Sequence, residues 1–187
     1  LVLLVLVAAI FAPVLAPEDP YQINLLKRLA PPGPSELLGR DDFGRDIFSR
    51  IIYGSRVSLQ VGLFSTLVAL IIGIPLGLVA GYYGGRIDNV IMRFLDVMMA
   101  FPSILLALTM IAAFGTNLSS VIMSIGLVAV PRYARITRGS TLSVKGMEYI
   151  DAAEALGAKT GRVLFKHILP NCLAPIIVYA TMGMASA

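Results

Sequence analysis

Long apolar runs with few charges are the feature that most restricts how this chain can fold. Several are about 17–25 residues long, the length of a helix that crosses a hydrocarbon core about 30 Å thick. The chain is 57% hydrophobic and 14% charged, whereas a soluble domain is about 25% charged. The runs also lack the alternation of apolar and polar residues that a transmembrane barrel needs. The sequence therefore predicts an all-α membrane protein, a polytopic helical bundle.

The apolar runs predict five membrane spans, and both ends of the sequence lie inside a run. We therefore expect the first and last spans to be incomplete. A secretory signal peptide is the alternative for the first run, but a signal peptide starts with positive charge, and none is visible here. The predicted spans cover approximately residues 1–16, 57–81, 90–114, 118–133 and 171–187.

The segment 17–56 is polar, rich in proline, and balanced between six basic and six acidic residues. Its last part, 41–56, predicts a turn followed by a short amphipathic helix. We expect this helix to lie against the membrane surface. The apolar face of the helix would carry Ile47, Phe48, Ile51 and Ile52.

Gly73, Gly77 and Gly81 recur every four residues near the end of the second predicted span. Small residues at this spacing let another helix approach closely within a membrane. A chance occurrence is the alternative, because glycine is common in membrane helices. We predict that this glycine ladder is a helix-packing site, and that Pro75 kinks the same helix.

Arg93 and Asp96 lie near the start of the third predicted span, three residues apart and so on one helix face. A charge at the bilayer centre costs about 2.5–3.5 kcal/mol, which pairing partly offsets. We predict that the two form an intramembrane charge pair close to the interface. The alternative is that they line a cavity. Pro102 is predicted to break this helix.

The net charge of +4 is concentrated in one polar segment. Residues 132–167 hold seven Lys or Arg and three acidic residues. Alternation of the spans puts 82–89 and 132–170 on one side of the membrane and 17–56 on the other. The count of Lys and Arg weakly favours the cytoplasm for the first side. Alanine and aliphatic residues dilute the basic ones and the aromatic residues are scattered, so we expect no nucleic-acid partner.

Residues 146–170 predict two short helices joined by a glycine turn. The first has one apolar face and ends at Gly157, as helices often do at glycine. The second is capped by Thr160 and ends at Pro170. The predicted apolar positions are Met147, Ile150, Ala153, Leu156, Val163, Leu164 and Ile168.

Small side chains make the first of these helices suitable for docking into a groove of another protein. They are Ala152, Ala153 and Ala155. The alternative is an amphipathic connector that rests on lipid head groups.

Single occurrences exclude several kinds of catalytic and metal site. Cys172 is the only cysteine and His167 the only histidine, which rules out an intrachain disulfide and a two-histidine zinc motif. The sequence GAKT at 157–160 lacks the upstream glycine and the strand context of a Walker A loop. We expect no cofactor, no metal and no enzymatic activity in this chain.

The stretch DAAEALG…ILP at 151–170 resembles the cytoplasmic signature loop of ABC importer permeases. That pattern reads E-A-A, three residues, Gly, nine residues, I-x-L-P. Asp151 stands where the pattern has Glu, and His167 where it has Ile. The residues at matching pattern positions are Ala152, Ala153, Gly157, Leu169 and Pro170.

Two further stretches resemble the dipeptide, oligopeptide and nickel subfamily of these permeases. Residues 37–62 are similar to a segment that reads approximately LGTDxxGRDxxSRxxYGxRxSL, with Arg40 in place of its usual Thr. Residues 84–103 are similar to GGxxDxxxMRxxDxxxxFPS. The three separated motifs occur in the family's order, and the resemblance extends over almost the whole chain.

The resemblance implies the type I ABC importer transmembrane fold, with five of six expected spans, in a bacterial or archaeal inner membrane. It implies a transmembrane domain over 57–187 and a cytoplasmic coupling loop over 134–170. The expected partners are a second homologous permease subunit, two cytoplasmic ABC ATPases that hydrolyse the ATP, an extracytoplasmic solute-binding protein and the lipid bilayer. The residues expected to couple to the ATPases are Glu148, Asp151, Ala152, Ala153, Gly157, Leu169 and Pro170.

The function that the resemblance implies is ATP-driven import of di- or oligopeptides, with nickel, glutathione and sugars left open as solutes. An ion-coupled secondary transporter is the alternative. It would need functional charges in mid-span, and Arg93 and Asp96 alone come near. A membrane-embedded enzyme would need a base beside a nucleophile, and His167 and Cys172 lack that context.

Overall fold

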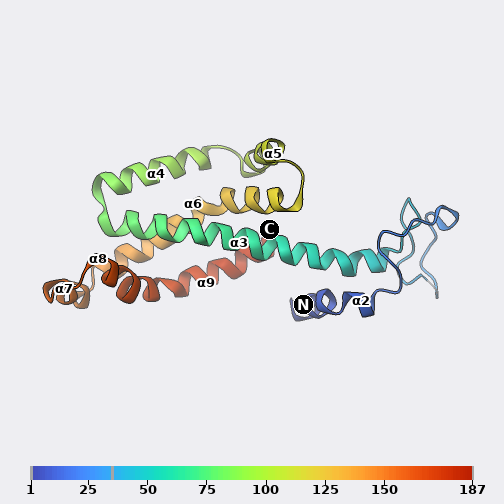
Figure 1. The fold of residues 1–187 in the computed structure, drawn as a ribbon, viewed down its shortest axis with the longest axis horizontal. Coiled ribbons are helices and arrows are strands. Elements are labelled where there is room, and N and C mark those ends of the chain that lie inside the picture. Colours follow the sequence, from blue (N-terminus) through green and yellow to red (C-terminus); the bar gives the residue numbers. More distant parts are fainter. Residues whose placement is uncertain (1, 35, 187) are drawn as a thin grey trace. The chain divides into compact units, whose positions relative to one another are not determined.

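The structure is a computed structural model that describes residues 2–34 and 36–186, with side chains described for 5–34 and 36–184. Within these residues every regular element is a helix, and one isolated antiparallel bridge joins Arg40 to Asp46. The chain divides into two compact units, Leu1–Gln60 and Val61–Ala187. The helix α3 (Ile47–Tyr83) begins in the first unit and continues into the second (Figure 1).

The first unit contains short helices and a long irregular segment. These helices are α1 (Val2–Ile10), α2 (Ala12–Leu15) and the 3-10 turn η1 (Leu25–Lys27). Arg56 of α3 donates hydrogen bonds to the backbone carbonyl oxygens of Ala9 and Ile10. These bonds tie the end of α1 to the start of α3.

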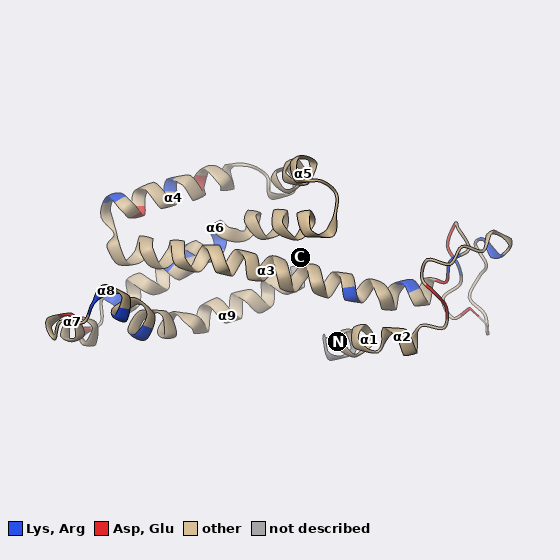
Figure 2. Cartoon of the chain, in the orientation of Figure 1, with Lys and Arg blue, Asp and Glu red and all other residues tan. Residues whose placement is uncertain are grey.

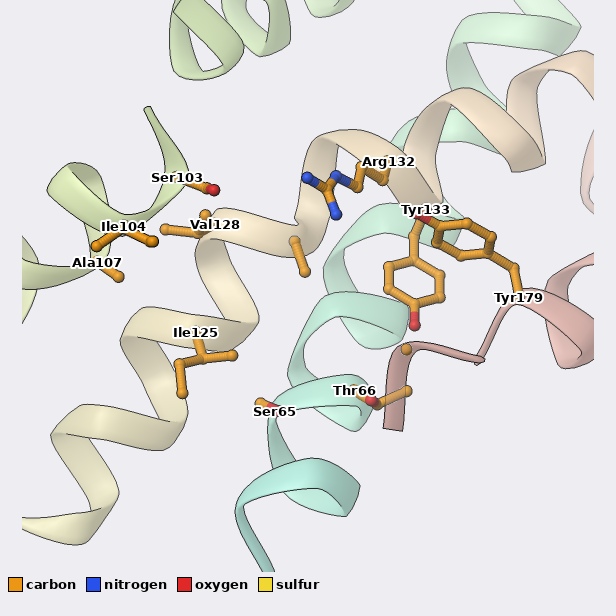
Figure 3. Close-up of a pocket in the computed structure, with 12 residues that line it drawn as sticks. Ser65, Thr66, Ser103, Ile104, Ala107, Ile125, Val128, Arg132, Tyr133 and Tyr179 are labelled. Atoms are coloured by element: carbon orange, nitrogen blue, oxygen red, sulfur yellow. The ribbon is translucent and has the colours of Figure 1, made fainter. Parts of the chain in front are cut away.

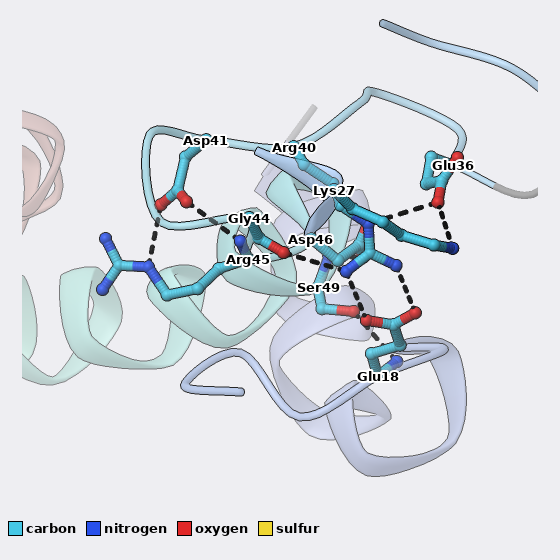
Figure 4. Close-up of polar contacts among 9 residues, drawn as sticks. All are labelled: Glu18, Lys27, Glu36, Arg40, Asp41, Gly44, Arg45, Asp46 and Ser49. Carbon is cyan, nitrogen blue, oxygen red and sulfur yellow. Dashed lines mark hydrogen bonds and ion pairs between the residues drawn. The ribbon is translucent and has the colours of Figure 1, made fainter. Parts of the chain in front are cut away.

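Arg40 is the centre of a buried ion network in the irregular segment (Figure 4). Its side chain is 3% exposed, and its guanidinium donates to both carboxylate oxygens of Glu18 and to Glu36 Oε1 at 3.2 Å. It also donates to the carbonyl oxygen of Gly44 at 2.9 Å. The residue that departs from the family pattern therefore has its charge fully compensated locally, which a buried arginine requires.

Asp41 organises the turn that precedes α3. Burial raises its pKa, but hydrogen bonds from the backbone N–H groups of Arg45 and Phe43 and from the Arg45 guanidinium outweigh burial and lower the pKa to about 2. A lowered folded-state pKa stabilises the ionised form. The stabilisation is therefore present above pH 4 and is lost as the pH falls towards 2.

We expect Arg40→Ala to destabilise this network by about 3 kcal/mol, because it leaves the Glu18 carboxylate without its ion pair, while Glu36 keeps Lys27. The measurement is hydrogen–deuterium exchange of the amides of residues 36–46 in the full chain. Arg28→Ala is the matched control, since Arg28 and Asp42 are 3.9 Å apart and both largely exposed, and exposed pairs contribute about 0–1 kcal/mol. Equal exchange rates in the two variants would contradict a structural role for Arg40.

The second unit is a bundle with α6 at its centre. Besides α3, it contains α4 (Gly85–Ala100), α5 (Ser103–Phe114), α6 (Leu118–Lys145), α7 (Glu148–Ala155), α8 (Thr160–Arg162), the π-helical segment η2 (Val163–Ile168) and α9 (Leu169–Ser186). α4, α5 and α9 all pack against α6 (Figure 1). An apolar cluster forms where Leu95 of α4 meets Val130 and Ala134 of α6.

Two described helices are long and apolar enough to cross a membrane, α3 and the continuous helix Thr160–Met184. α4 and α5 make a third if they count as one span, bent by 91° at Phe101 and Pro102. The predicted break at Pro102 is confirmed, but the predicted count of five spans is not. α1 and α2 are each shorter than the roughly 20 residues that a span requires.

Charged residues are absent from α5, α9 and the part of α3 after Arg56 (Figure 2). In the most apolar stretch of α3 only 39% of the residues are buried, and in that of Thr160–Met184 only 28%. Large apolar side chains such as Ile71 and Ile104 are exposed. Such a surface is stable against lipid or a partner subunit rather than against water.

Three predicted boundaries are wrong, each because a helix continues through polar residues. The predicted surface helix of 47–56 is the start of α3, whose Ile51 is exposed and Ile52 buried. α6 runs through 134–145, which we assigned to the polar loop. Helix also continues past Pro170, because the wider π-helical turn of η2 lies before it and accommodates the missing N–H.

Candidate coupling surface and helix-packing site

α7 is a short helix that ends at a glycine. Gly157 has a φ of +81°, in the left-handed region that glycine adopts without steric cost. Its N–H donates to the carbonyl oxygen of Glu154 at 2.9 Å, and the N–H of Ala158 donates to that of Ala153 at 3.0 Å. These bonds satisfy the last carbonyl groups of the helix, and the predicted helix end at Gly157 is confirmed. Thr160 is not the cap of the next helix, because Lys159 occupies that position.

One face of α7 is fixed to the bundle. Ile150 is 1% exposed. Tyr82 Oη donates to Glu154 Oε1 at 2.8 Å, and Asn171 Nδ2 donates to Tyr149 Oη at 3.2 Å. α7 is thereby tied to α3, α6 and α9 at once. The residues that form an apolar cluster with Ile150 are Leu78, Val144, Val163, Leu164, Ile168, Cys172 and Ile176.

The opposite face of α7 is exposed. Successive helical residues are about 100° apart, so Ala152 lies about 200° around the helix from Ile150. Leu156, which we expected on the buried face, is 89% exposed because the helix ends at Ala155. Tyr149 and Glu154 are also exposed, but both hydrogen-bond to the bundle. We call the other exposed residues of α7 and its following turn the α7 outer face. They are Glu148, Asp151, Ala152, Ala155, Leu156 and Gly157.

Three of the residues predicted to couple to the ATPases lie outside the α7 outer face. Leu169 is half-buried and packs against the cluster around Ile150. Pro170 is exposed, in the first turn of α9. Ala153 is half-buried on the side of α7 that faces the bundle.

The glycine ladder of α3 lies directly against α6. A Cβ on Gly77 would lie 2.4 Å from the carbonyl oxygen of Ala134 and 2.6 Å from Thr137 Cβ. A Cβ on Gly73 would lie 2.8 Å from Tyr133 Cβ, and one on Gly81 2.7 Å from Thr141 Cβ. Real side chains essentially never approach so closely, so the two helices need glycine at all three positions to pack at this distance.

The predicted charge pair between Arg93 and Asp96 is wrong. Asp96 pairs instead with Arg135 of α6, and no ion pair in the described part of the chain includes Arg93. The reason is that α4 packs along α6, so Asp96 meets a long cation from the neighbouring helix. Both members of this pair are about half exposed.

Sequence reasoning missed the ion pairs that join α4 to α6. Besides the pair of Arg135 with Asp96, Arg138 donates to both carboxylate oxygens of Asp88. A hydrogen bond from Lys145 Nζ to the carbonyl oxygen of Tyr82, at 2.6 Å, additionally joins α6 to α3. The available signal is an arginine at every third position from 132 to 138, which is typical of one helix face. We did not recognise this signal, because charged residues that follow a short apolar run are also typical of a polar loop.

The described residues contain no cluster of three His, Cys, Asp or Glu side chains that could hold a metal ion. Cys172 is buried, with its Sγ 3.9 Å from Thr141 Oγ1. The charged side chains of the second unit that are discussed below lie instead on the α7 outer face, in the ion pairs between α4 and α6, and at Arg132.

Residues 73–187 match the family described as the binding-protein-dependent transport system inner membrane component. The chain is 51% identical over 179 residues to a dipeptide transport system permease protein of Alkalihalophilus pseudofirmus, covering 96% of this chain and 59% of that protein. It is 41% identical over 192 residues to one of Haemophilus influenzae, covering 100% and 65%. A glutathione transport system permease protein of Pectobacterium atrosepticum is 43% identical, covering 97% and 60%. The chain thus spans less than two thirds of the length of these relatives.

Proposed function

The chain belongs to the family of binding-protein-dependent transport system inner membrane components, and we propose that it is a permease subunit of an ATP-driven ABC importer of short peptides. Relatives named for the transport of dipeptides and of glutathione support this class of solute. We propose that the chain works in the inner membrane with a second permease subunit, two cytoplasmic ATPases and an extracytoplasmic binding protein.

The observation that carries the proposal is the two-sided α7. Its inner face is tied to three long helices through Ile150, Tyr82 and Asn171. Its outer face offers exposed alanines and the exposed Leu156, which suit a groove on another protein. A partner that moves when it binds ATP would therefore displace the ends of α3, α6 and α9 together. A contact that differs between two states is what such coupling needs.

The orientation follows from the same assignment. The α7 outer face lies in the cytoplasm, with the ATPases, and the segment 17–56 lies on the opposite side, where the binding protein delivers its peptide. The domain assignment of 57–187 as the transmembrane domain is part of this proposal. Because helix runs through 134–145, the coupling element proper is narrower than predicted and comprises 146–159.

The test is uptake of a radiolabelled dipeptide by proteoliposomes that contain this chain in its full-length form, the second permease, both ATPases and the binding protein. We expect accumulation to require both ATP on the ATPase side and the binding protein. Accumulation that persists without ATP and collapses when an uncoupler dissipates the ion gradient would instead identify an ion-coupled secondary transporter.

A further inference from the structure

Arg132 is the first of three arginines that recur every third residue on α6. The other two pair with carboxylates of α4, Arg135 with Asp96 and Arg138 with Asp88. Arg132 has no carboxylate partner in the part of the chain that the structure describes. One member of an otherwise paired series is therefore left with an uncompensated charge.

The bend between α4 and α5 explains why Arg132 is unpaired. α4 ends at Ala100 and the chain turns by 91°, so α4 offers no carboxylate at the next position along α6. Arg132 instead lines a small pocket together with Phe101, Pro102 and Ser103. A pocket thus lies where a carboxylate partner of Arg132 would be expected.

Arg132 also lines a neighbouring, partly open cavity of about 270 Å³ between α3, α5, α6 and α9 (Figure 3). The hydroxyl groups of its wall belong to Ser65, Thr66, Ser103, Tyr133 and Tyr179, and the rest of the wall is largely aliphatic. None of its described lining residues is acidic. The cavity therefore combines one positive charge with several hydrogen-bonding groups.

Tyr133 brings an unused hydrogen-bonding group to this cavity. Its side chain is 2% exposed, and its hydroxyl oxygen makes no hydrogen bond of normal geometry, with Thr66 as the one polar side chain close enough to interact with it. A Cβ on Gly183 would lie 2.3 Å from that oxygen, so any larger residue there would force the tyrosine hydroxyl to shift. A buried polar group without a partner is costly, which is consistent with a ligand that completes its bonding.

Arg132 lies near the middle of α6, about 20 Å from either end at 1.5 Å per residue, and its side chain is exposed. An exposed guanidinium without a carboxylate partner is available to an anionic ligand. An arginine fork is also suited to a carboxylate, which it can bind through two parallel hydrogen bonds.

We propose that this cavity is a transit site for the transported peptide and that Arg132 binds the peptide's terminal carboxylate. The inference rests on the proposed function, because it takes the solute to be a short peptide. The terminal carboxylate is common to peptides of any sequence, so one fixed arginine serves them all. The hydroxyl groups of Tyr133 and Ser103 supply further hydrogen bonds, and the aliphatic wall tolerates different side chains.

The first test uses a dipeptide that carries a benzophenone side chain and the complete, purified importer. We expect light to attach this probe to the chain, and an excess of plain dipeptide to prevent labelling. The same dipeptide with a C-terminal amide should not compete, because it lacks the carboxylate. Equal competition by the amide would overturn the proposal.

The second test compares Arg132→Gln with Arg132→Lys in dipeptide uptake. A charge-assisted hydrogen bond corresponds to about a 10- to 100-fold effect, so we expect Gln to lower both labelling and uptake by that factor and Lys to restore most of it. Arg86→Gln is the matched control, since Arg86 is an exposed arginine of α4 outside the cavity. Uptake by Arg132→Gln equal to that by Arg86→Gln would overturn the proposal.

Two outcomes separate this inference from its premise. If the unmodified importer accumulates no dipeptide, the proposed function fails and the transit site falls with it. If it does accumulate dipeptide but Arg132→Gln no longer co-purifies with the second permease, while Arg132→Lys does, then Arg132 pairs with that subunit. The transit site alone would then be refuted.

Discussion

Ala152→Arg should lower ATP-dependent dipeptide uptake at least tenfold while leaving the subunit folded in the membrane. Ala152 is exposed on the side of α7 opposite Ile150, so the larger side chain disturbs nothing within the chain. It does keep the helix from seating in a groove, because a guanidinium on a long stem needs space and hydration that a closely fitted interface lacks. The measurements are uptake and co-purification of the ATPases with the permease.

Ser143→Arg is the matched control for this variant. Ser143 is exposed near the end of α6, outside the α7 outer face, and it receives the same side chain. We expect it to retain uptake. If Ala152→Arg transports and co-purifies as Ser143→Arg does, the α7 outer face is not the docking surface.

The variant Ile150→Ala distinguishes binding of the ATPases to α7 from attachment of α7 to the long helices of the bundle. Ile150 is buried in the cluster that joins α7 to the long helices, and such truncations cost about 2–5 kcal/mol. We expect the ATPases to remain bound but ATP hydrolysis to drive less uptake, because α7 then moves without taking α3, α6 and α9 with it. Unchanged uptake per ATP hydrolysed would show that the packing of Ile150 does not transmit the motion of α7 to the long helices.

The local features of the α7 region could be predicted from the sequence because they depend on near neighbours. Glycine often ends a helix because it adopts the left-handed conformation without steric cost, and Gly157 does so here. Val163, Leu164 and Ile168 are buried, as their helical spacing predicts. The prediction that Leu156 belongs to the apolar face was wrong, because α7 ends at Ala155 and the helical spacing does not extend beyond it. Helix ends are the positions that sequence patterns fix least.

The pairing of charges could not be predicted, because it depends on which helices are neighbours. Arg93 and Asp96 are suitably spaced for a pair within one helix, yet Asp96 reaches Arg135 thirty-nine positions away. The contact requires the bend at Pro102 and the return of α6 alongside α4. The same arrangement explains why 134–145 is helix rather than loop, since Arg135 and Arg138 pair with carboxylates of α4.

The glycine ladder, by contrast, was predictable as a packing surface but not as a contact with a particular helix. Spacing alone indicates that a neighbour approaches closely. The structure adds that this neighbour is α6 and that the approach involves its backbone, from Val130 to Arg138. α6 also holds the ion pairs and Arg132, so the ladder fixes the position of the helix on which both proposed sites depend.

Gly77→Leu should therefore be the most damaging single substitution in the bundle. Its Cβ would lie 2.4 Å from the Ala134 carbonyl oxygen and 2.9 Å from the Arg138 backbone nitrogen, and backbone atoms of a packed helix cannot rotate away as a side chain can. Overpacking of a well-filled core costs about 1–3 kcal/mol, occasionally more. We expect α6 to be displaced from α3, the amount of folded subunit in the membrane to fall severalfold, and dipeptide uptake to be lost.

Gly54→Leu is the matched control, because Gly54 lies in the same helix and a Cβ there meets nothing within 4 Å. Folded subunit is measured as the monodisperse fraction of a fluorescent fusion on size exclusion, before and after heating. Gly77→Ala should be intermediate, since it adds the clashing Cβ without the branches beyond it. If Gly77→Leu gives the same folded fraction and the same uptake as Gly54→Leu, then α3 and α6 do not pack through the ladder. The placement of Arg132 in a cavity between them would then lose its support.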